Sequence, residues 1–141
     1  MKGWIACAFI VATASLAAQA PMAKMAITGE EDYSKTMKEV GATNGAMRKA
    51  ITSASEADVA TSAAKLEGLF KNVQAYWEMK KVEDATTAAK NAVAASQAIA
   101  KAVAAHDMAA ANTAATTLGA QCMACHTAHR EKTPEGTFKM K

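Results

Sequence analysis

Proline, aromatic residues and strand-like alternation are all scarce in this sequence. Only two of the 141 residues are proline, Pro21 and Pro134, and aromatic residues make up 5% of the chain. No segment alternates β-branched and polar residues in the way that predicts a half-buried strand. Alanine is the commonest residue, and its high helix propensity favours helix throughout. The length suits one domain, so we expect a single all-α domain.

The chain also lacks a large excess of charge of either sign. It has 16 Lys and Arg residues against 13 Asp and Glu residues, a formal net charge of +3 at pH 7. Without a basic patch, we expect no nucleic-acid partner. A core of Ala, Val, Leu and Met buries little apolar area, so a bound apolar cofactor would add contact area that the side chains lack.

The N-terminus carries the features of a secretory signal peptide. Lys2 precedes an apolar run, 4–18, and small residues lead up to Ala20. The run is shorter than the ~20 residues that cross a bilayer comfortably. We therefore expect a signal peptide over 1–20, an exported mature domain over 21–141, and no stable membrane span after leader removal. Cleavage after Ala17, or retention as an uncleaved anchor, are alternatives, and Cys7 leaves with a cleaved leader.

Near the other end, residues 122–126 read C-x-x-C-H, the attachment signature of c-type haem. Two thiols bond the two vinyl groups of a haem, and the adjacent histidine becomes the proximal axial ligand of the iron. A bare C-x-x-C also occurs in thioredoxin-like redox pairs and in zinc sites. The zinc alternative needs two further ligands, and the redox pair needs a preceding strand. The motif therefore predicts one haem c, attached covalently to Cys122 and Cys125 and ligated by His126.

Apolar residues at three-four spacing predict four helices, at approximately 30–53, 55–79, 82–105 and 108–132. The capping-box pattern at 28–31 starts the first helix, and Asp107 caps the fourth. Thr133 and Pro134 end the fourth helix, and a loose tail follows from Gly136. Four helices of similar length with short turns predict an antiparallel up-down-up-down bundle, with haem near the C-terminal end of helix four.

The height of each residue along its helix indicates which side chain could be the distal iron ligand. His126 lies about as far before the end of helix four as Met37 lies after the start of helix one, so antiparallel packing puts both at one height. Met47 would lie ~15 Å away along the axis, and His106 ~30 Å away in a solvated turn. We therefore expect Met37 to be the distal iron ligand; ordinary packing of Met37 over an open iron is the alternative. Residues at the same height on the four helices are expected to line the haem pocket; they are Tyr33, Val40, Phe70, Val73, Trp77, Ala89, Leu118 and Cys122.

Three stretches together resemble a known family over approximately residues 30–132. The sequence M-K-E-V-G at 37–41 is similar to that family's M-K-x-x-G, Leu69-Phe70 is followed by Trp77, and C-x-x-C-H is followed by Arg130. The chain resembles the class II c-type cytochromes, the cytochrome c′ and cytochrome c-556 family.

The resemblance implies two functional alternatives. In c-556-like members a methionine at the Met37 position coordinates iron, whereas c′-like members leave the iron five-coordinate and open to NO and CO. Arg130 matches a basic residue near the proximal face. We expect His129 to be exposed on the last helical turn; a hydrogen bond from His129 to a haem propionate is the alternative. Relatives are often dimers through the first two helices, so a homodimer is possible.

We expect a periplasmic monohaem one-electron carrier that docks transiently on redox partner proteins. The alternative is a c′-like protein that binds NO or CO. Since no general acid or base accompanies Met37 and Val40 on the distal side, we do not expect an enzyme.

Overall fold

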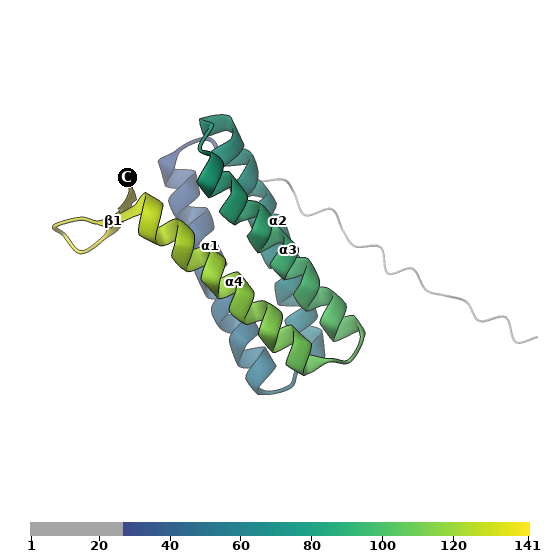
Figure 1. Cartoon of the computed structure of the whole chain (residues 1–141). Helices are drawn as coiled ribbons and strands as arrows, with labels where there is room; N and C mark the ends of the chain where they lie inside the picture. Colours follow the sequence, from purple (N-terminus) through teal and green to yellow (C-terminus); the bar gives the residue numbers. More distant parts are fainter. Residues whose placement is uncertain (1–26) are drawn as a thin grey trace, which may run out of the picture.

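The computed structural model describes residues 27–141, so the expected signal peptide and its cleavage sites lie outside the described residues. Four helices make up most of this part of the chain, which confirms the prediction of a mostly helical, four-helix protein (Figure 1). They are α1 (Glu30–Thr52), α2 (Glu56–Lys80), α3 (Glu83–Ala104) and α4 (Met108–His129). Across residues 27–141, no helix combines the length and apolar character that a membrane span requires.

The predicted N-cap of α4 is confirmed, whereas the capping box predicted for α1 does not form. Asp107 is the N-cap of α4, and its carboxylate accepts a hydrogen bond from the Ala110 N–H at 2.8 Å. The N-cap of α1 is Gly29, which has no side chain to cap the helix. The Thr28 N–H instead donates to the Asp32 carboxylate at 3.3 Å, so the expected capping box does not form.

The end of α4 differs from the prediction. The helix stops at His129 rather than at 132, because the next residues form a strand, β1 (Arg130–Lys132), that pairs antiparallel with β2 (Phe138–Met140). The turn between them is closed by the Thr133 N–H donating to the Thr137 carbonyl at 2.8 Å. Gly136 adopts a φ of 82°, a conformation that suits glycine. The tail expected to be loose therefore folds back as a hairpin, residues 130–140, which we call the C-terminal hairpin.

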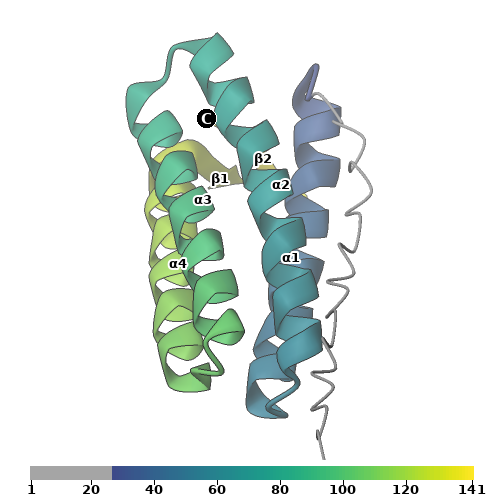
Figure 2. The ribbon, with the colours of Figure 1, turned by 90° about the vertical axis from the view of Figure 1, so that its right-hand side faces the viewer.

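Packing is uneven around the four helices. Helix α2 packs against both α1 and α3, and α3 packs against α4, whereas α1 and α4 contact each other sparsely (Figure 2). Met47, Leu66, Ile99 and Leu118 are fully buried at the centre. The seam between α1 and α4 is bridged by Arg48, whose guanidinium donates to the Ala115 carbonyl at 3.4 Å. Beyond this bridge, toward the C-terminal end of α4, the seam holds the cavities described next.

Candidate haem site

Two adjoining cavities lie along the seam between α1 and α4. The outer cavity has a volume of about 760 Å³ and is lined by the start of α1, the end of α4 and the C-terminal hairpin. The inner cavity has a volume of about 140 Å³ and is lined by residues of all four helices. Tyr33, Met37, Cys125 and His126 line both cavities, so the two form one continuous site around these side chains.

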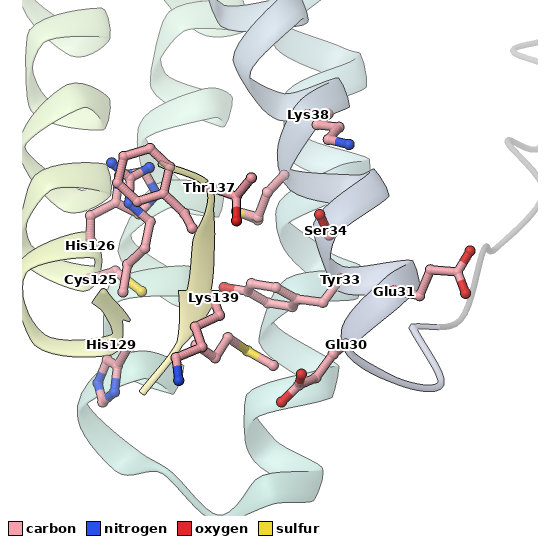
Figure 3. Close-up of a pocket in the computed structure, with 14 residues that line it drawn as sticks. Glu30, Glu31, Tyr33, Ser34, Lys38, Cys125, His126, His129, Thr137 and Lys139 are labelled. Carbon is pink, nitrogen blue, oxygen red and sulfur yellow. The ribbon is translucent and has the colours of Figure 1, made fainter. Parts of the chain in front are cut away.

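The residues of the C-x-x-C-H motif form the α4 wall. Cys125 and His126 line both cavities and Cys122 lines the inner one. Figure 3 shows Cys125 and His126 on α4 facing the space that Tyr33 enters from α1. Both cysteines are half-buried free thiols rather than a disulfide. Burial raises the pKa of both thiols, with smaller effects from charged neighbours, so they stay protonated near neutral pH.

The surroundings of His126 favour the neutral form of its imidazole. Burial lowers the pKa of its imidazole, and the nearby charge of Arg130 lowers it further. A neutral imidazole has a free ring nitrogen, which is the ligand that iron takes from histidine. His126 therefore presents a neutral imidazole to the two cavities.

Met37 faces the same site from α1. It is half-buried, lines both cavities and packs against the core. Met47 is 0% exposed within the core and lines neither cavity. His106 is exposed in the turn before α4, where its Nδ1 lies 2.8 Å from the Glu56 carboxylate. The structure thus separates Met37 from Met47 and His106 as the helix-level argument expects.

Tyr33 is oriented by Trp77. The Trp77 Nε1–H donates to the Tyr33 hydroxyl oxygen at 3.1 Å, and the two rings meet edge to face at 5.6 Å between centroids. Burial raises the pKa of Tyr33 to about 12, with a smaller contribution from Cys125. Tyr33 therefore stays neutral, and its own O–H remains a donor at the cavity. Trp77 itself is buried and lines neither cavity, so it acts on the site through Tyr33.

The expectation that His129 is exposed is wrong. Its side chain is 20% exposed, its ring lies 5.3 Å from the Trp77 ring, and its Nε2 lies 2.8 Å from the Asp84 carboxylate. This contact lowers the pKa of Asp84. His129 thereby links the end of α4 to the start of α3 while also lining the outer cavity.

The remaining expected wall residues separate into two groups. The inner cavity is lined by Val40, Phe70, Val73 and Ala89, whereas Arg130 lines the outer cavity. Leu118 lines neither, because it is fully buried in the core beneath. The site also contains residues that sequence reasoning missed: Ser34 and Lys38 from α1, and Thr137, Phe138, Lys139 and Met140 from the C-terminal hairpin. The turn residues Pro134 and Gly136 between two short segments were the available signal for that hairpin.

A zinc site lacks its ligands in the part of the chain that the structure describes. Within residues 27–141, no group of three or more His, Cys, Asp or Glu side chains is placed to hold a metal ion. No protein-family model matches the chain, and searches of curated proteins and of solved structures gave no match. The functional argument therefore rests on this chain's own residues.

Proposed function

We propose that this protein is a periplasmic monohaem c-type cytochrome that carries one electron, with haem bound through Cys122 and Cys125. His126 would be the proximal iron ligand and Met37 the distal one. One observation carries the proposal: Met37 from α1 and His126 from α4 line the same two cavities, with both cysteines in the wall. Consecutive packed helices joined by short turns suit an up-down-up-down bundle with this site near the end of α4.

The residues of the site fit a haem. The outer cavity, about 760 Å³, lies within the ~300–1,000 Å³ typical of cofactor sites. The inner cavity offers apolar walls at Val40, Phe70 and Val73. The thiols are free, and each S–H can add across a vinyl group, forming a C–S bond while the proton goes to the neighbouring carbon. When bound, haem would supply the iron that accepts and releases one electron.

The protein's contribution is to hold that iron in one environment. A neutral His126 and the Met37 thioether can stay in place in both oxidation states, since both arise from packed helices. Little rearrangement is then needed when an electron arrives or leaves. Methionine ligation and a site shielded from water both favour a higher reduction potential. Partners would dock weakly and transiently, as redox partners do.

The distal ligand can be tested with a matched pair of methionine variants. Met37→Ala should open the iron, convert its spectrum toward high spin and allow CO binding to the ferrous form. Met79→Ala is the control, because Met79 is exposed on α2 and lines neither cavity. Ferrous and ferric absorption spectra with and without CO measure the difference. A wild-type protein that is high-spin and binds CO readily would refute Met37 ligation and favour the c′-like alternative.

Covalent attachment has its own test. Replacing Cys122 and Cys125 with Ala should leave haem extractable by acid-acetone, whereas the wild-type protein should retain its haem through that treatment. Haem that remained fixed in the double variant would contradict attachment through these sulfurs. A colourless wild-type protein from a host with working cytochrome-assembly machinery would refute the proposed function as a whole.

A further inference from the structure

The C-terminal hairpin forms a wall of the outer cavity that the four helices do not provide. Thr137, Phe138, Lys139 and Met140 all line that cavity, together with Arg130 at the base of the hairpin. Figure 3 shows Thr137 and Lys139 between the labelled residues of α4 and those of α1. The hairpin residues therefore belong to the site as much as the helical ones do.

Several contacts fix the hairpin onto the last turns of α4. Arg130 pairs with Met140 in the register of the two strands, and Met140 packs against the core. The Lys141 N–H donates to the His129 carbonyl at 3.0 Å, and the Lys141 ammonium donates to the Thr127 carbonyl at 3.1 Å. This register determines which side chains of β2 face Arg130.

Phe138 lies directly against the Arg130 guanidinium. The guanidinium carbon is 3.8 Å from the centroid of the Phe138 ring, well within the ~6 Å of a cation–π contact. Among residues 27–141, no carboxylate lies within ion-pair distance of Arg130, whereas Lys139 is paired with Glu131 at 2.9 Å. The ring thus holds a cation at the cavity that has no acidic partner in the described part of the chain.

The two cavities differ in the chemistry that they offer a haem. The inner cavity is largely apolar and contains Cys122. The outer cavity has the cations of Lys38, Arg130 and Lys139 in its wall, together with the carboxylates of Glu30 and Glu31. The vinyl groups and the carboxylates of a haem lie at opposite edges of the ring. Bonding to Cys122 in the inner cavity, and to Cys125 where the two cavities adjoin, would therefore leave the carboxylate edge toward the outer cavity and the hairpin.

We propose that Phe138 is a positioning residue, which holds the Arg130 guanidinium in the outer cavity as the cationic partner of the haem carboxylates. This inference rests on the proposed function. Neutralising a carboxylate with a fixed cation favours the reduced site, because the incoming electron then meets less negative charge. The hairpin would thus raise the reduction potential without contributing a ligand to iron.

The test is the reduction potential of the full-length holoprotein in four hairpin variants. Arg130→Gln removes the cation, and Phe138→Leu keeps apolar bulk but removes the aromatic face. Each should lower the equilibrium constant for reduction about three- to tenfold, roughly 30–60 mV at 59 mV per tenfold for one electron. Phe138→Tyr retains the aromatic face and should keep the wild-type potential. Lys132→Ala also removes a hairpin cation, but Lys132 lines neither cavity, so it should leave the potential unchanged.

The outcomes separate this inference from the proposed function. If Arg130→Gln leaves the potential unchanged, or if Phe138→Leu matches wild type while Arg130→Gln does not, the positioning role is overturned. If Lys132→Ala lowers the potential as much as Arg130→Gln, the effect is one of general charge and the inference also fails. In each of these cases, haem that survives acid-acetone leaves the proposed function standing. A wild-type protein without attached haem would overturn both.

Discussion

The hydrogen bond between Trp77 and Tyr33 yields the sharpest prediction about stability. It joins α2 to α1 beside the site, with Trp77 only 5% exposed. Tyr33→Phe removes the acceptor and leaves a buried indole N–H unpaired, which costs about 1–3 kcal/mol. Trp77→Phe removes the donor and also loses packing area. In the double variant no N–H remains to be left unpaired, so its destabilisation should be smaller than the sum of the two single values.

The expected coupling is about 1–3 kcal/mol, because the cost of leaving the indole N–H unpaired occurs in Tyr33→Phe and is absent from the double variant. Denaturant unfolding of wild type, the two single variants and the double variant would measure this coupling, provided that all four share one m-value. The packing loss at residue 77 occurs with and without the tyrosine hydroxyl, so it cancels in the cycle. Additivity within about 0.3 kcal/mol would refute the bond as a stabilising contact.

Tyr76 offers a matched control for that cycle. Its ring packs edge to face on Trp77 at 5.4 Å between centroids, yet its buried hydroxyl has no hydrogen-bond partner among the described residues. Tyr76→Phe removes an unpaired polar atom and should be neutral, or stabilising by up to about 1 kcal/mol. A Tyr76→Phe loss equal to that of Tyr33→Phe would show that removing either hydroxyl destabilises the fold, whether or not that hydroxyl accepts the indole hydrogen bond.

Two further predictions concern pH and helix packing. Burial raises the pKa of the Tyr33 phenol to about 12 in the folded protein, whereas its pKa is about 10 in the unfolded chain. The contribution of Tyr33 to the free energy of unfolding is therefore fully present below pH 10 and is lost as the pH rises toward 12. The loss of stability should reach roughly 2–3 kcal/mol. Denaturant unfolding at pH 9 and at pH 12 should show a smaller decrease in the free energy of unfolding for Tyr33→Phe than for wild type. An equal decrease in the two proteins would contradict the raised pKa of Tyr33. A Cβ at Gly119 would meet only the end of the flexible Arg48 side chain, at 2.9 Å, whereas one at Gly45 would meet nothing within 4 Å. Both Gly→Ala variants should therefore raise stability in thermal unfolding, Gly45→Ala by up to about 1 kcal/mol and Gly119→Ala by less. A large loss of stability in Gly119→Ala would show that the Arg48 contact with the Ala115 carbonyl is essential to the seam between α1 and α4.

Local patterns were sufficient for the helices and for part of the site. Three-four spacing depends only on residues one or two turns apart, so the four helices could be placed to within a few residues. The cap at Asp107 is equally local. Helix rise was enough to expect Met37 and His126 at one level, and both side chains do line the same two cavities.

The errors occurred where distant residues compete with local preference. Residues 130–132 can continue a helix, but pairing with 138–140 and the Arg130 contact with Phe138 favour a strand. His129 has the sequence context of an exposed last-turn residue, yet Asp84 and Trp77 from other helices cover it.

By itself, the sequence determined the four helices and the C-x-x-C-H motif, because a helix and a five-residue motif are encoded by near neighbours. Only the tertiary structure decided which side chains share a cavity. Trp77 became a support for Tyr33 instead of a wall, and the hairpin became a wall instead of a loose tail. The physical reason is that burial and through-space contacts depend on how all the elements pack together, which no single stretch of sequence specifies.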